Sequence, residues 1–132
     1  MGVTSRYLQD KQARHILLNQ TYTPPAVVFL SCHITSPGVD NTGTEVAGGL
    51  GYARQPTTWD FTSFWSAWWL TAPVVFGPST GAWGTIAHCG VYDAASGGNL
   101  LYYGPLYATF PIVASQTLTF PAFQIAFFIR IF

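Results

Sequence analysis

Charged side chains are scarce in this sequence: Asp, Glu, Lys and Arg make up 8% of its 132 residues, against about 25% in an ordinary soluble domain. Positive and negative side chains are equal in number, so the net charge is zero. Nucleic acid is therefore disfavoured as a partner, because phosphate binding needs clustered Lys and Arg. A surface with so few charges is poorly soluble when it is left open to water. The composition favours a protein that buries much of its outside against copies of itself or other chains.

Long apolar runs are also missing, although 49% of the residues are hydrophobic. A membrane-spanning helix needs about 20 predominantly apolar residues. The richest stretch, residues 64–76, is interrupted by Ser66, Thr71 and Pro73. Residues 1–18 mix charges throughout and lack the apolar core of a signal peptide. We therefore expect no membrane partner, and we expect the protein to fold in the cytoplasm of its host.

Cysteine is nearly absent, and each of the two cysteines stands beside a histidine, in the pairs Cys32-His33 and His88-Cys89. Two Cys and two His form a common zinc ligand set. Both pairs fall within expected strands, however, where neighbouring side chains point to opposite faces. One metal ion can then reach only one member of each pair, so we interpret all four as buried, satisfied core residues. A disulfide is disfavoured in a protein that folds in a cytoplasm.

Catalytic motifs are missing as well. The five carboxylates, at positions 10, 40, 45, 60 and 93, are not spaced as a paired acid and base. The glycine-rich segment at residues 48–51 has no following Lys and opens no helix, unlike a phosphate-binding loop. The sequence therefore predicts a protein that is not an enzyme and that needs no cofactor or metal.

The strongest structural signal in the chain is a β-hairpin. Two apolar, β-prone runs, residues 83–92 and 100–106, flank a turn that contains Asp93, Gly97, Gly98 and Asn99. Glycine adopts positive φ at no steric cost, and the short Asp and Asn side chains bond to nearby backbone groups. We expect this turn to set the register of a central hairpin.

The remaining segments predict a single mainly β domain over residues 1–132. Residues 1–19 form a helix or arm, capped by Thr4 or Ser5 and ending near Leu18, with Asp10 and Arg14 as an i,i+4 pair. Strands are expected at residues 26–35, 51–59, 73–76, 109–120 and 122–132, with Gly and Pro between them. The predicted fold class is an antiparallel β-sandwich or barrel-like sheet pair, built by residues 22–132, with a short N-terminal α-helix.

Residues 60–72, DFTSFWSAWWLTA, are apolar at both odd and even positions. A strand and a helix would both have two apolar faces here, so the pattern leaves the type of element open. A sheet strand has one inward face, so the outward set needs another partner. We predict an assembly interface that contains Trp65, Trp68 and Trp69, together with Phe128 and Phe132 near the end of the chain. A glycan-binding platform of tryptophan rings is the alternative.

Four segments carry a family resemblance: YTPPAVVFLSCHITSPG at residues 22–38, GGLGYARQPTTW at 48–59, WGTIAHCGVYDAASGGNLLYYGPL at 83–106 and SQTLTFPAFQIAF at 115–127. In this order they resemble a family of small virion proteins of tailed bacteriophages, whose members are labelled tail-fibre-like or minor structural proteins. Similar small β-proteins decorate capsids as cement. The resemblance implies a β-sandwich with a short N-terminal helix and no catalysis. The chain departs from the family pattern in DFTSFWSAWWLTA and in its final AFFIRIF, and both departures add apolar surface.

Together these observations favour a non-enzymatic structural protein of a phage virion. The leading hypothesis is a capsid cement or decoration protein that forms a homo-trimer or another small ring on the head shell. Its partners would be copies of itself and the major capsid protein or other virion proteins. A tail, neck or fibre component is the first alternative, and a glycan-binding module is the second.

Overall fold

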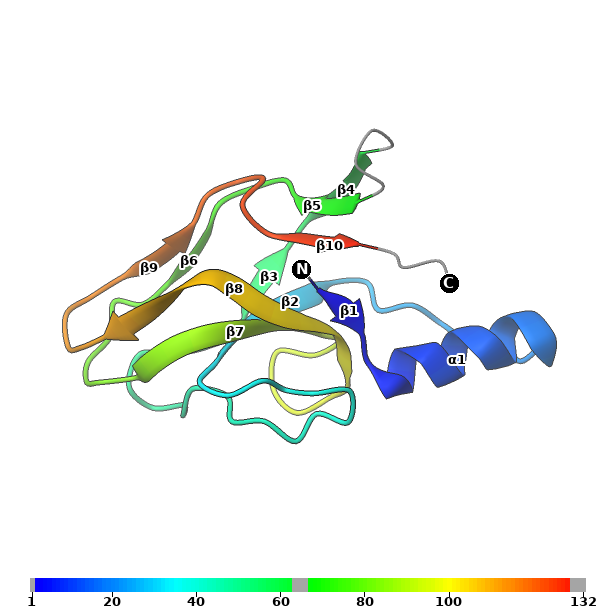
Figure 1. Ribbon diagram of the computed structural model, residues 1–132, viewed down its shortest axis with the longest axis horizontal. Coiled ribbons are helices and arrows are strands. Elements are labelled where there is room, and N and C mark those ends of the chain that lie inside the picture. The colour runs from blue at the N-terminus through cyan, green and yellow to red at the C-terminus, as the bar shows by residue number, and fades with distance from the viewer. Residues whose placement is uncertain (1, 63–66, 129–132) are drawn as a thin grey trace.

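The computed structural model describes residues 2–62 and 67–128 (Figure 1). These residues form the helix α1 (Arg6–Leu17) and a set of short antiparallel strands. The strands are β1 (Val3–Thr4), β2 (Val28–His33), β3 (Gln55–Thr57), β4 (Trp59–Thr62), β5 (Ala67–Leu70), β6 (Val74–Phe76), β7 (Gly84–Tyr92), β8 (Leu100–Ile112), β9 (Leu118–Phe120) and β10 (Ala126–Phe128). The prediction of a mainly β fold with one short N-terminal helix is confirmed.

The largest sheet has the strand order β1-β8-β7-β2-β3, with the predicted hairpin β7–β8 at its centre. Strand β8 continues to Ile112, six residues beyond the expected end of the hairpin, and it contains Pro105 and Pro111. Strand β1 pairs with Tyr102 and Tyr103 of β8. No strand of the described residues continues along the later part of β8 on that side, so a residue without a backbone N–H is tolerated there.

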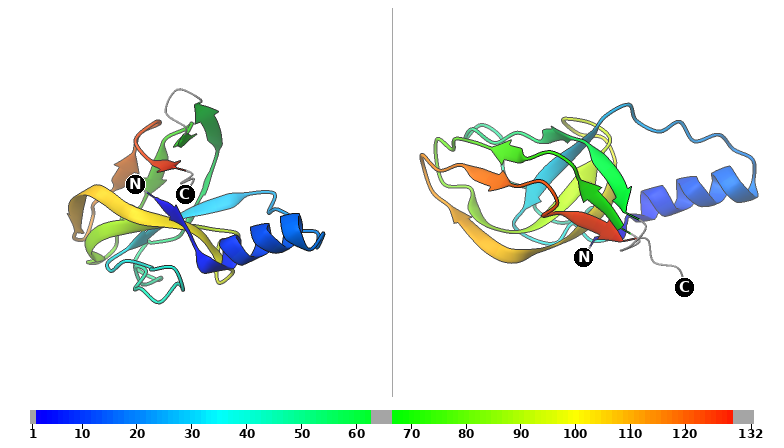
Figure 2. Two further views of the ribbon diagram at one scale, coloured as in Figure 1. Left: turned by 45° about the vertical axis from the view of Figure 1, so that its right-hand side comes forward. Right: turned by 90° about the horizontal axis from the view of Figure 1, so that it is seen from above.

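A second layer covers one face of this sheet. It consists of the sheet β10-β5-β4 and the ribbon β6-β9, which lie above the large sheet in Figure 1 and in the left view of Figure 2, and in front of it in the right view of Figure 2. Alternate residues of each strand point into the space between the layers. The core formed there includes Leu30, Cys32, Val91, Leu70, Val74, Phe76, Ile86 and Phe120. The arrangement is the sandwich-like sheet pair that the sequence predicts.

Within residues 60–72, for which the sequence left the type of element open, residues 60–62 and 67–70 lie in strands. Strand β4 pairs with β5, and Phe61 lies opposite Trp68 while Asp60 lies opposite Trp69. The expected strand at residues 51–59 begins later, at Gln55. In a strand, side chains two residues apart point to the same face. Tyr52 instead packs in the core beside Trp83, while Arg54 reaches Glu45 outside the core.

Helix α1 agrees with its prediction at both ends. Ser5 is the N-cap and accepts a hydrogen bond from the backbone N–H of Leu8, while Arg14 pairs with Asp10. Leu8 is the buried residue of the helix, and every residue from 12 to 21 is exposed. The helix accordingly projects from the body of the protein (Figures 1 and 2). Within the described ranges no helix has the length and apolar character needed to cross a membrane.

Candidate functional site

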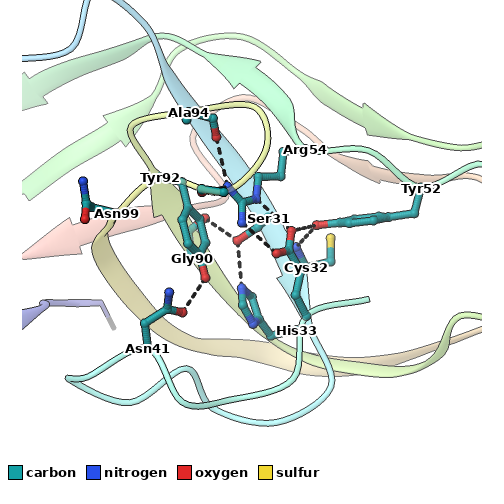
Figure 3. A network of polar contacts seen from close by, with 12 residues as sticks. Ser31, Cys32, His33, Asn41, Tyr52, Arg54, Gly90, Tyr92, Ala94 and Asn99 are labelled. Carbon is teal, nitrogen blue, oxygen red and sulfur yellow. Dashed lines mark hydrogen bonds and ion pairs between the residues drawn. The ribbon is translucent and has the colours of Figure 1, made fainter. Parts of the chain in front are cut away.

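The face of the large sheet that is turned away from the core carries a buried polar cluster (Figure 3). Ser31 Oγ donates to the Gly90 carbonyl at 3.1 Å and lies 2.9 Å from His33 Nε2. The Tyr92 hydroxyl donates to Asn41 Oδ1 at 2.6 Å. Strands β2 and β7 thus present polar side chains on this face, and residue Asn41 from the long loop after β2 closes over them.

At the edge of this cluster Glu45 and Arg54 form a bidentate ion pair. Arg54 Nε and Nη2 donate to the two carboxylate oxygens at 2.9 and 2.8 Å, and the Tyr52 hydroxyl donates to the same carboxylate at 2.8 Å. Burial alone would raise the pKa of Glu45, but the hydrogen bonds from Arg54 and Tyr52 outweigh it and lower the pKa. The Tyr52 hydroxyl also accepts a hydrogen bond from the backbone N–H of Cys32. Cys32 lies in β2, beyond the residues of β2 that pair with β3.

Arg54 also holds the turn of the central hairpin. Its Nη1 donates to the carbonyls of Ala94 and Gly97 at 3.0 and 2.7 Å, and its guanidinium lies 3.6 Å from the centre of the Tyr92 ring. One side chain therefore ties the segment around Glu45 to both the start and the middle of the β7–β8 turn. Arginine suits this position because its planar fork offers several donors in fixed directions.

The four residues assigned to the turn from the sequence lie within it. Gly97 and Gly98 have φ of 63° and 70°, the left-handed region that favours glycine. The Asp93 carboxylate accepts hydrogen bonds from the Asn99 backbone N–H at 2.7 Å and from its side-chain amide at 3.0 Å. A Cβ atom at Gly98 would collide with Asp93 Oδ1, whereas one at Gly97 would meet nothing within 4 Å. Gly98 is thus constrained by both backbone angle and space.

Ser31 and His33 have the separation of a nucleophile and its base. Both side chains are closed off from solvent, at 0% and 1% exposure, and the Ser31 hydroxyl already donates to Gly90. Burial lowers the pKa of His33 to about 4, so the imidazole is neutral near pH 7. A substrate has no access to either group, so the arrangement favours a structural role.

The two Cys-His pairs are divided between the two faces of the sheet. Cys32 lies opposite Cys89, with both thiols free and buried toward the core, while His33 lies opposite His88. The prediction that both histidines are satisfied is wrong in one respect, since Nδ1 of each is buried without a hydrogen-bond partner. Among the described residues, no three His, Cys, Asp or Glu side chains gather closely enough to hold a metal ion.

Of the predicted assembly residues, Trp68 and Trp69 are the two whose side chains the structure describes, and they do not lie together. Trp68 is 42% exposed, and its ring lies 5.2 Å from the equally exposed ring of Phe61. Trp69 is half-buried and lines a cavity of about 280 Å³ between β5–β10 and β8. Because the two tryptophans are consecutive in β5, they point to opposite faces of the small sheet. Trp65 and Phe132 lie outside the described residues, as does the side chain of Phe128, whose backbone pairs with Ala67.

A comparison with protein families decides the identity. A family described as "Podophage GP4 fiber I protein gp80" matches residues 3–127, which is nearly the whole chain. The chain belongs to this family of podophage fibre proteins. A search of curated proteins found no match. The resemblance to tail-fibre-like virion proteins is thereby confirmed, and the match identifies the chain as a phage structural protein. The family description gives the fibre alternative its support and offers none to capsid cement.

The interactions that hold this polar face together are not evident from the sequence alone. Glu45 is predicted only as one of five unpaired carboxylates, yet among the described residues it forms with Arg54 the least exposed ion pair, with side chains 25% and 9% accessible. The sequence does contain one indication of this pair. Glu45 and Arg54 are separated by uncharged residues only, and they stand on either side of the glycine-rich residues 48–51. Opposite charges on both sides of a closing loop indicate a pair.

Proposed function

We propose that this protein is a non-enzymatic structural subunit of a podophage fibre, which works by packing against copies of itself and against other virion proteins. The observation that carries this proposal is the family match over residues 3–127. The fold adds support, because the hydrogen bonds of Arg54 hold the segment around Glu45 and the β7–β8 turn in place. These contacts occupy the polar groups that a substrate would otherwise bind.

The surface of the small sheet supports the assembly part of the proposal. Phe61 and Trp68 face solvent from the register-paired positions of β4 and β5, with 44% and 42% of their area exposed. Buried aromatic anchors dominate the binding energy of protein interfaces. A pair of touching aromatic rings on a surface with little charge is therefore suited to contact another virion subunit.

Immunogold labelling of purified virions tests the proposed place of the protein. An antibody against the purified chain should label the fibres or the tail in electron micrographs, and prior absorption of the antibody with the chain should remove the label. Labelling distributed over the head shell would instead support the cement hypothesis and contradict a fibre location. If the intact particles lack the chain, the proposed role in the virion is wrong.

Glycan binding is a second candidate function, because the ring of Trp68 is exposed and sugars stack on exposed aromatic rings. The two roles differ in the response to Trp68→Ala. A glycan-binding module would lose sugar affinity and still assemble, whereas an assembly surface would lose association and show no sugar binding to begin with.

A further inference from the structure

We propose that the apolar tip of helix α1 from one copy binds in the cavity beside Trp69 of a second copy, with Lys11 of the first copy against Asp60 of the second. This inference deepens the proposed function and rests on its assembly part, because a subunit that packs against copies of itself needs two complementary surfaces. The tip is defined as Ile16, Leu17 and Leu18.

The first half of helix α1 packs on its own chain, whereas the apolar tip at its end is exposed. The three side chains of the tip are 75%, 77% and 60% exposed, and they follow one another at the end of a projecting helix (Figure 2). A helix of 12 residues is marginal in water unless tertiary packing supports it. Packing at Leu8 and the Ser5 cap supports only the first half of this helix. Contact with a second copy would support the other half and remove the tip from water.

The cavity beside Trp69 offers an uncharged, largely apolar place for such a tip. Its volume is about 280 Å³, and its walls include Trp69, Leu106, Tyr107, Ile125 and Ala126. Gly2 also lines it, so helix α1 begins next to the cavity of its own chain and then runs away from it. Because a helix of this length extends about 18 Å, the tip cannot return to that cavity. The tip that binds in this cavity must therefore come from a second copy of the chain.

The charges of the described residues point to the same pairing. Arg6 pairs with Asp40, Arg14 with Asp10 and Arg54 with Glu45. Asp93 is engaged by Asn99. Among the described residues this leaves one cation, Lys11, and two anions, Asp60 and Asp93, without an ion-pair partner. Asp60 is the exposed one of the two anions, and within residues 2–62 and 67–128 it accepts only the backbone N–H of Phe61. Lys11 on the arm and Asp60 on β4 are therefore the charges available to a second copy. Their opposite signs suit a contact between an arm and a body.

The position of Asp60 fits the cavity. Asp60 lies opposite Trp69 in the β4–β5 register, so both side chains are on the same face of the small sheet, and Trp69 is a wall of the cavity. Lys11 precedes the tip by five to seven residues, which is about 8–10 Å along a helix. A helix seated with its tip in the cavity can thus bring Lys11 toward Asp60, which is exposed on the strand beside Trp69. Because tip and cavity are different surfaces, the contact closes either as a two-fold exchange of arms between two copies or, head to tail, as a ring or filament.

Charge reversal tests this contact in the full chain. Lys11→Glu and Asp60→Lys should each weaken self-association by roughly three- to tenfold in sedimentation experiments at low salt. The double variant should restore most of the loss, because the pair is rebuilt with the signs exchanged. Lys11→Glu combined with Thr119→Lys, a cation on the distant strand β9, should not recover. A double variant that associates no better than the single variants overturns the contact, and so does a wild-type chain that sediments as a monomer.

Cross-linking supplies an independent test of where the tip binds. A Leu17→Cys chain mixed with a Tyr107→Cys chain should form a disulfide-linked dimer under mild oxidation. Leu17→Cys mixed with Thr119→Cys serves as the control. Because the free thiol of Cys89 lines the cavity, every chain in this test also carries Cys89→Ala. Equal yields in both mixtures would then overturn the proposed seat of the tip. Either failure leaves the immunogold result for the virion location unaffected, so the two proposals fail separately.

Discussion

The guanidinium of Arg54 stacks 3.6 Å from the centre of the Tyr92 ring while its Nε and Nη2 bind the Glu45 carboxylate. Loss of this side chain would leave a partly buried carboxylate without its cation and free the turn carbonyls of Ala94 and Gly97. We expect Arg54→Ala to lower the free energy of unfolding by about 3–5 kcal/mol in urea titrations. Arg54→Lys should recover part of this loss, because it keeps the charge without the fork. A change below about 1 kcal/mol for Arg54→Ala would show that these contacts of Arg54 contribute little to the stability of the fold.

The two turn glycines should respond differently to alanine. Both have positive φ, so each substitution strains the backbone by roughly 1–3 kcal/mol. At Gly98 the added Cβ also collides with Asp93 Oδ1 and Ala94, whereas at Gly97 it enters open space. Thermal unfolding should therefore show a larger loss of stability for Gly98→Ala than for Gly97→Ala. Equal losses, or none, would mean that the turn adopts another conformation.

The stability of the protein should fall as the pH is lowered from 7 to 5. Burial holds the pKa of His33 at about 4 in the folded chain, against about 6.5 in the unfolded chain. The unfolded state therefore binds more protons within this window, and below pH 6.5 the free energy of unfolding should decrease by about 1.4 kcal/mol per pH unit.

The His33→Gln variant isolates this effect, because it should flatten the pH dependence of the urea midpoint between pH 7 and 5. His15→Gln, a change at an exposed helix position, provides the control and should keep the wild-type slope. Measurements that stop at pH 5 exclude the loss expected from Glu45, whose lowered pKa acts only in more acidic solution. A slope that survives in His33→Gln would assign the pH dependence to other groups.

Trp68 should act in association rather than in folding. Its ring is 42% exposed, whereas its neighbour two residues on, Leu70, is fully buried in the core. Trp68→Ser should leave the melting temperature nearly unchanged and weaken association by about thirtyfold, as the loss of a typical interface anchor does. Leu70→Ser should instead prevent stable folding. Wild-type association of the Trp68→Ser chain would contradict the role of the β4–β5 face.

The parts of the fold that the sequence predicts are those governed by local patterns. The α1 cap at Ser5 and the β7–β8 hairpin follow from residue types within a few positions of one another. The extension of β8 through Pro105 and Pro111 was not predicted, because its tolerance depends on how little of β8 is paired with β1. Strand β1 itself was missed, since two residues carry no periodicity.

The candidate sites show the same limit. The sequence identifies Trp68 and Trp69 as apolar residues in excess of one core face, but only the register shows that Trp68 joins Phe61 and that Trp69 faces Asp60 and a cavity. The role of Arg54 depends on contacts with Ala94 and Gly97, which lie about forty positions away along the chain. Long-range pairings of this kind are set by topology, and no local pattern encodes them.

The central claim, that the protein is a fibre subunit of the virion, is tested most directly by its copy number. Quantitative mass spectrometry of purified particles gives the ratio of this chain to the major capsid protein. A fibre subunit should be present in tens of copies or fewer per particle, far below the capsid protein, in multiples set by the symmetry of the fibre. A ratio near one copy per capsid protein would contradict the fibre assignment and indicate a lattice-covering cement.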